Sequence, residues 1–238
     1  SENMTRWSLT EFHMEIPPQG AVSLKGEYDS STGALRGIIK GGGLELGRAF
    51  ARIFHLPADF HLALLLDEAF MELEREAEGP LMWKGSVHAS NIEFHSADFD
   101  RAGENMTVGM GFSGRIEPDT GTNHFQAHFQ MERGECLYDT FYFNLSKTPF
   151  TLSLDGSYHA PSSTLCIDDL RAALHSVVQL HCRGGLDLGT DPSHGDLEIT
   201  APVQPMAPLV SKFVQEPFGA SIPGIESMEL DGRWGGVV

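Results

Sequence analysis

A seven-residue phrase that occurs three times constrains the fold of this chain more than any other feature of its sequence. The copies are Val22-Ser-Leu-Lys-Gly-Glu-Tyr28, Leu152-Ser-Leu-Asp-Gly-Ser-Tyr158 and Met228-Glu-Leu-Asp-Gly-Arg-Trp234. Every second residue of the phrase is apolar, glycine or aromatic, which is typical of a strand with one buried face. A second phrase, Gly42-Gly-Leu-Glu-Leu-Gly47, returns as Gly184-Gly-Leu-Asp-Leu-Gly189. The repetition predicts a sheet of similar strands, with residues 20–56 resembling residues 150–190.

Composition limits the classes of partner. The 238 residues carry a formal net charge of −17, which disfavours general attraction to phosphate backbones and anionic lipid headgroups. Nucleic acid is therefore not expected as a partner. No run of eighteen apolar residues occurs, so no membrane-spanning segment is expected. Three cysteines without CxxC spacing argue against a zinc site and a disulfide scaffold, although a bridge between Cys166 and Cys182 stays open beside Cys136.

Alternating apolar residues predict strands over much of the chain. One strand ends at Pro17-Pro18, and a hairpin follows with arms at 22–28 and 34–40. The period of two persists from Leu81 to Tyr158. Strands are expected there at 81–95, 105–117, 122–133, 136–146 and 149–158, and later at 184–189, 196–203 and 226–234. The short connections indicate antiparallel neighbours in a long, strongly curved sheet.

Helical spacing interrupts this alternation. Residues 58–78 space their leucines by three and four, which predicts an amphipathic helix, and residues 165–182 repeat the spacing. Shorter helices are expected at 44–54 and 208–214. No long linker divides the chain, so the sequence predicts a single domain over residues 1–238. The expected fold is α+β and β-rich, a large curved antiparallel sheet (groove, taco or open barrel) with two main amphipathic helices packed on it.

The order of these motifs resembles the pattern of AsmA-like and TamB-like bacterial envelope proteins. The resemblance rests on the apolar-x-Leu-Asp-Gly-x-aromatic phrase, on Leu165-Cys-Ile-Asp-Asp-Leu170 and on the Gly-Gly-Leu-Asp-Leu-Gly phrase, over residues 20–56 and 150–236. It implies a taco-shaped groove with an apolar floor that carries lipid acyl chains, and a periplasmic or cell-envelope location. The chain departs from the family in having about three copies of the repeat and in its histidines and glutamines on the middle strands.

The apolar residues of the first helix and of the sheet are the candidate ligand-binding residues. We expect a lipid or another hydrophobic small molecule to lie between them. The candidates are Leu62, Leu65, Leu66, Phe70, Phe141, Phe143 and Leu152. If the helix instead completes a solid core, the same residues are structural.

The strand that begins at His124 separates polar from apolar residues. His124, Gln126, His128 and Gln130 share one face, which either lines a cleft or faces solvent. In a polar, Tyr-lined pocket the two histidines would act with a carboxylate such as Asp139 or Glu117, in a β-barrel enzyme of the cyclase, isomerase or hydrolase type.

A third alternative is a structural or assembly module. The strand that contains residues 228–234 would leave an open edge for self-association. Among the three alternatives we expect ligand binding rather than catalysis. No metal site and no cofactor are expected, because no recognised ligand spacing or cofactor fingerprint occurs in the chain.

Overall fold

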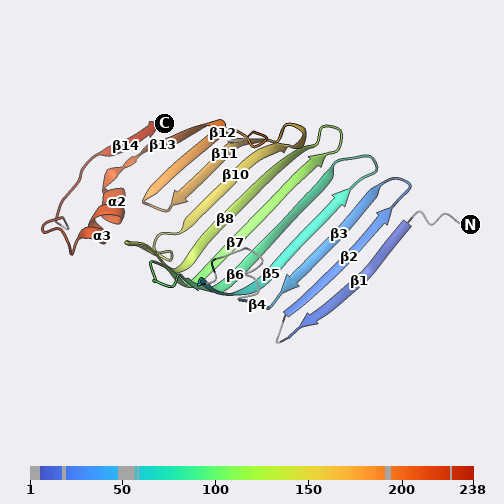
Figure 1. Cartoon of the computed structure of the whole chain (residues 1–238), viewed down its shortest axis with the longest axis horizontal. Coiled ribbons are helices and arrows are strands. Elements are labelled where there is room, and N and C mark those ends of the chain that lie inside the picture. The colour runs from blue at the N-terminus through green and yellow to red at the C-terminus, as the bar shows by residue number, and fades with distance from the viewer. Residues whose placement is uncertain (1–5, 18–19, 48–56, 58, 191–193, 226) are drawn as a thin grey trace, which may run out of the picture.

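The chain forms one large antiparallel sheet in the computed structural model, which describes residues 6–17, 20–47, 57, 59–190, 194–225 and 227–238. Within these residues, fourteen strands lie in the order β1-β2-β3-β5-β6-β7-β8-β10-β11-β12-β13-β14, with β4 beside β5 and β9 beside β8. The sheet is curved and does not close, because β1 and β14 end this path (Figure 1).

The element bounds are as follows. The first strands are β1 (Arg6–Ile16), β2 (Gly20–Asp29), β3 (Ala34–Gly42), β4 (Leu44–Leu46), β5 (His61–Arg75), β6 (Leu81–His95) and β7 (Arg101–Glu117). The later strands are β8 (Thr122–Tyr138), β9 (Phe141–Asn144), β10 (Phe150–His159), β11 (Thr164–Leu174), β12 (Val178–Asp187), β13 (His194–Pro205) and β14 (Arg233–Val237). The helical turns are η1 (Ala160–Ser162), α2 (Met206–Val210), η2 (Ser211–Gln215) and α3 (Glu216–Phe218).

The strands expected from alternation are present. The N-terminal strand, the first hairpin and the antiparallel meander from β6 to β10 are confirmed. Two details are wrong. The strand expected at 136–146 is divided, because β8 continues to Tyr138 and then turns into the short β9. The closing strand begins only at Arg233, so most of the third copy of the phrase lies outside any strand.

The helix expected at 58–78 is wrong, because this segment is strand β5, paired with β3 and β6. A β-bulge at Asp67 explains the error. It adds one residue between Leu66 and Glu68, so the same-face residues Leu66 and Ala69 are three apart, as they would be in a helix. Backbone pairing on both sides then overrides the helical propensity of the leucines.

The helix expected at 165–182 is wrong for the same reason. The segment forms β11, a turn and the first part of β12. The register shifts between Ile167 and Leu170, so this bulge also imitates helical spacing. Of the helix expected at 44–54, residues 44–46 form strand β4, and most of the remainder lies outside the described residues. The helix expected at 208–214 is confirmed, within the helical segment of residues 206–218. None of the described helical segments has the length and apolar character needed to cross a membrane.

The register gives the sheet one apolar face. Residues that pair across antiparallel strands point to the same side, so a row of paired residues can be followed across the sheet. One such row crosses eleven strands without a charged residue: Phe12, Leu24, Ile39, Met71, Gly85, Phe112, Ala127, Leu154, Leu170, Cys182 and Ile199. We call the side that carries this row the apolar face.

The opposite side is the polar face. A row on it, one position along each strand, contains Ser23, Lys40, Phe70, Ser86, Gly111, His128, Ser153, Arg171, His181 and Thr200. The bulges keep this separation intact. Each bulge takes up one extra residue outside the pairing, so the residues on both sides of it stay on their own faces.

The sheet is a single layer over most of its area. The chain exposes 15533 Å² of surface, whereas a compact protein of 26.0 kDa exposes roughly 10,500 Å². Among the described residues, the buried hydrophobic side chains are Ala89, Met106, Leu145, Leu174 and Val177. No described element packs across the middle of the apolar face to form a second layer.

Candidate functional site

The apolar face is the candidate functional site. Its side chains in the middle strands, such as Trp83, Phe125 and Phe129, are half-buried by their neighbours. Aromatic contacts connect several of them, including Trp83 with Phe112 at 5.9 Å and Phe129 with Phe150 at 6.2 Å between ring centroids. These aromatic residues were not among the ligand-binding candidates, although the alternation of their strands already placed them on one side.

Large hydrophobic side chains of this face are exposed near both edges of the sheet. At the β1 edge they are Trp7, Leu9, Phe12, Met14, Leu24, Tyr28 and Ile39. At the other edge they are Leu180, Leu197 and Ile199. A soluble protein rarely exposes a contiguous apolar patch of this extent unless the patch receives a ligand or a partner.

The predicted ligand-binding residues divide between the two faces. Leu66 pairs with Ala89, and Leu152 lies between Phe129 and Ala172, so both belong to the apolar face. Phe70 lies in the polar row, 6.0 Å beneath the Lys40 ammonium. Leu65 pairs with Glu45 and Ser90, and it also points to the polar face.

Leu62, Phe141 and Phe143 lie at the end of the sheet where the helical segment of residues 206–218 packs. Leu62 pairs with Phe94, and the two phenylalanines of β9 meet the ring of Phe213 edge-on at 5.8 Å and 6.1 Å. This end is therefore partly covered, in contrast to the rest of the apolar face.

Lys212 is a buried cation at this covered end. Its ammonium pairs with Glu216 and lies 5.4 Å from the centre of the Phe143 ring. Burial raises the pKa of the nearby Cys136 thiol, and the charge of Lys212 opposes the increase. The lysine thus has an acidic partner already, and the thiol is held in its neutral form.

Ion pairs are concentrated on the polar face. Glu72 accepts a hydrogen bond from Lys84 at 2.8 Å and lies 3.7 Å from Arg36. The hydrogen bond from Lys84 lowers the pKa of Glu72 more than desolvation raises it. Arg183 and Glu198 form a similar cross-strand pair at 2.8 Å. The polar face is hence a solvated surface on which several charges are matched across strands.

The catalytic candidates do not form a site together. His124 and His128 lie on the polar face and are exposed, and the Nδ1 atom of His128 is 3.1 Å from the Ser153 hydroxyl. Asp139 lies in the turn beyond the other end of β8, eleven residues from His128, which is roughly 30 Å or more along a strand. Glu117 is engaged by Arg115 at 2.7 Å. Neither histidine bonds to a carboxylate among the described residues.

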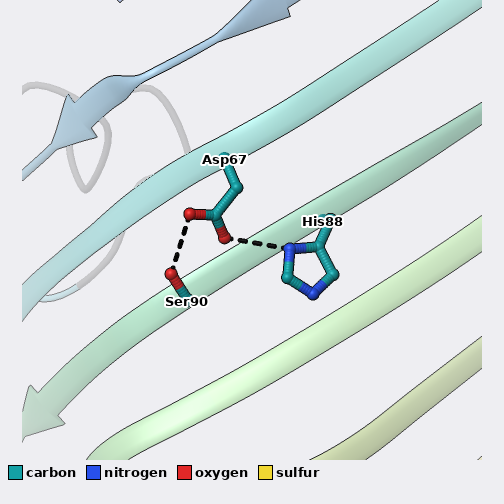
Figure 2. A network of polar contacts seen from close by, with 3 residues as sticks. All are labelled: Asp67, His88 and Ser90. Carbon is teal, nitrogen blue, oxygen red and sulfur yellow. Dashed lines mark hydrogen bonds and ion pairs between the residues drawn. The ribbon is translucent and has the colours of Figure 1, made fainter. Parts of the chain in front are cut away.

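A polar network lies on β5 and β6, at the bulge of Asp67 (Figure 2). The two carboxylate oxygens of Asp67 bind separate groups, the His88 Nδ1 atom and the Ser90 hydroxyl, each at 2.9 Å. Figure 2 shows the serine and the histidine on opposite sides of the carboxylate. Because the histidine does not contact the serine, it cannot remove the hydroxyl proton, and the group is not a nucleophilic triad. Its geometry instead holds the bulge in place.

The hollows of the described surface are open and mix polar with apolar groups. The most distinct one, about 460 Å³ in volume, is lined by Glu72, Lys84, Arg115, His124 and Asp155 together with neighbouring residues. Its walls combine these acids and bases with the apolar side chains of Trp83 and Phe125. The apolar face, by contrast, is an open surface without an enclosed cavity in the described part of the chain, so a ligand there would lie on the sheet.

No metal centre is formed by the described residues, in which no group of three or more potential ligands converges. The cysteines are free thiols. Cys182 belongs to the apolar row, whereas Cys166 pairs with Ser157 on the polar side. The Cys166–Cys182 bridge is therefore not formed.

Comparisons with known proteins give no family for this fold. No protein-family model, no curated protein and no solved structure matches the chain. The function must be argued from the two faces of the sheet.

Proposed function

We propose that the chain binds a lipid or another elongated hydrophobic molecule on the apolar face. The observation that carries the proposal is the row from Phe12 to Ile199, which crosses eleven strands without a charge. Covering such a face removes apolar surface from water, which favours binding by about 25 cal/mol per Å² before the costs of association.

The shape of the face favours an elongated ligand. Leu81 and Ala89 belong to the apolar face of one strand and lie eight residues apart, which is roughly 27 Å. One acyl chain spans about half of the 30 Å hydrocarbon core of a bilayer. The strands therefore offer room for at least one extended acyl chain along their direction.

The sequence pattern supports the same class of ligand. In the first two copies of the repeated phrase, the apolar, glycine and aromatic positions all lie on the apolar face. This arrangement is what the resemblance to AsmA-like and TamB-like proteins implies for an apolar groove floor. On the proposal, the chain handles lipid in a periplasmic or cell-envelope setting. The enzyme alternative lacks a comparable observation, because its two histidines are exposed and have no carboxylate partner in the described structure.

Binding of the neutral probe Nile red, followed by displacement with lipids, tests the proposal. Leu24→Glu places a charge on the apolar face, and we expect it to weaken binding about tenfold or more, because the charge is desolvated by the ligand. Ser23→Glu is the matched control, since it adds the same charge one residue away on the polar face. Equal affinities of the two variants for the probe would contradict the proposal. It would also be contradicted if the probe does not bind and mass spectrometry finds no lipid with the purified protein.

A further inference from the structure

The apolar face ends in a row that carries polar groups. At the end where β2–β3, β5–β6 and β7–β8 turn, the paired residues are Trp7, Tyr28, Leu35, Arg75, Leu81, Ile116, Asn123, Tyr158, Leu165 and Leu186. We call these residues the rim row. This end lies opposite the helical segment of residues 206–218 (Figure 1). The three apolar-face rows nearest to the rim row contain no charged residue. The rim row itself contains one, Arg75.

Arg75 is the cation of the rim row. It is the last residue of β5 and lies between Leu35 and Leu81, two apolar neighbours on adjacent strands. The side chain is half-buried, and its Nε atom is shielded from solvent without a hydrogen-bond partner among the described residues. An N–H group in that position costs free energy unless an acceptor reaches it.

No acid of the described chain neutralises this guanidinium. The ion pairs of the neighbouring strands use other groups, since Glu72 binds Lys84 and Arg36. Glu74 pairs with Arg36 and Met82 across the strands, on the polar face. Arg75 is one of several described arginines that form no ion pair with a described residue, in a chain with 33 acidic and 16 basic residues. The sheet itself separates Arg75 from Glu72 and Glu74, which lie on the polar face.

A second group of the rim row has the same deficit. Asn123 pairs with Ile116 and Tyr158, and its Oδ1 atom is buried without a hydrogen-bond partner among the described residues. The rim row therefore combines an unsatisfied donor and an unsatisfied acceptor with apolar neighbours, the arrangement that an amphipathic molecule matches with a polar head and an apolar tail.

We propose that Arg75 binds the anionic group, a carboxylate or a phosphate, of a ligand whose apolar part lies along the apolar face. This inference rests on the function proposed above and names its ligand class as anionic lipids. A guanidinium suits both anions, because its planar fork donates two parallel hydrogen bonds to either. The net charge of −17 repels anions at long range, so affinity for the head comes from contact at the rim and requires the tail.

Four probes test the inference on the full chain: dodecanoate, dodecyl phosphate, 1-dodecanol and inorganic phosphate. Each probe is used below any micellar concentration. Its affinity is measured by Nile red displacement or by calorimetry. The wild type is expected to bind the two anionic lipids roughly tenfold or more tightly than the alcohol. Arg75→Gln is expected to remove that preference while leaving the affinity for 1-dodecanol unchanged. Arg75→Lys, which keeps the charge, is expected to retain part of the preference.

Arg36→Gln is the matched control, because Arg36 lies on the neighbouring strand but on the polar face. It is expected to keep the full preference for anionic lipids. A preference that survives in Arg75→Gln, or equal binding of alcohol and anions by the wild type, would overturn the inference while leaving the proposed function intact. Inorganic phosphate bound as tightly as dodecyl phosphate would also overturn it, since the tail would then contribute nothing. If none of the lipids binds, the proposed function itself fails.

Discussion

Glycines are interspersed with large side chains along one row of the apolar face. The row contains Leu9, Gly26, Gly37, Leu73, Trp83, Gly114, Phe125, Gly156, Ile167, Gly184 and Leu197. The Trp83 ring occupies the space where a side chain at Gly114 would begin, and Phe125 lies 3.1 Å from the corresponding point at Gly156. The aromatic rings thus cover the neighbouring backbone, which gives a single layer side-chain contacts that a second layer supplies in other folds.

We predict that Gly114→Val destabilises the fold by about 1–3 kcal/mol, because the larger side chain displaces the neighbours of residue 114. The new side chain would meet the Trp83 ring and the His124 carbonyl oxygen, 2.5 Å from its Cβ position. Gly111→Val is the matched control on the polar side of the same strand, where nothing lies within 4 Å, and its effect should stay within about 0.5 kcal/mol. Urea unfolding measures the stability of both variants. Equal losses of stability would show that the Trp83 ring and Gly114 are not coupled.

Strands meet through charge pairs on the side that faces water. Glu72 of β5, which Lys84 of β6 holds at 2.8 Å, has a pKa below its ordinary value, chiefly because of that hydrogen bond. A carboxyl group whose pKa is lowered by folding adds stability above its unfolded-state pKa. That stability is lost as the pH falls through the folded-state pKa.

We therefore predict that Lys84→Met lowers the thermal midpoint by a few degrees at most at neutral pH, since the pair is partly exposed. The difference from the wild type should shrink as the pH falls into the acid range, where Glu72 becomes protonated in both proteins. Thermal unfolding at pH 7 and at pH 3 measures this. Lys147→Met is the control, as Lys147 forms no ion pair with a described residue. If the difference in thermal midpoint between Lys84→Met and the wild type is the same at both pH values, the effect of the substitution comes from packing.

The whole molecule is a curved layer rather than a closed body. Its path of twelve paired strands is roughly 53 Å wide at 4.8 Å per strand, and its surface exceeds that of a compact protein of the same mass. The small core lies at one end, around Leu145, which is 2% exposed. No described element covers the apolar face in the middle of the sheet.

We predict a radius of gyration clearly above roughly 18 Å, the value of a compact chain of this length. Small-angle scattering measures the radius, and light scattering on the same sample checks that the mass is that of a monomer. A monomer at or below the compact value would contradict the open sheet. A stable dimer would instead assign the apolar face, or the free edges at β1 and β14, to a second copy of the chain.

The sequence predicted most of the strands and the division of several of them into an apolar and a polar side. Alternation in the segments at 22–28, 81–95 and 122–133 identified strands with one apolar side, because strand geometry has a period of two whatever the surroundings. It also identified His124 and His128 as neighbours on a polar face. It did not distinguish a lined cleft from a solvated surface, since that difference depends on what covers the face.

Two kinds of information came only from the tertiary structure. The bulges at Asp67 and near Asp168 made β5 and β11 look helical, and only pairing with neighbouring strands shows an extra residue to be a bulge. The same pairing moved Phe70 and Leu65 to the polar face and aligned Arg75 with the apolar rim.

Alternation along the chain predicted an amphipathic sheet, because each strand carries its own division into apolar and polar sides. The tertiary structure showed that no described element covers the middle of the apolar side and that the cation of Arg75 lies at its end. Coverage and register are relations between distant segments, and local sequence does not encode them.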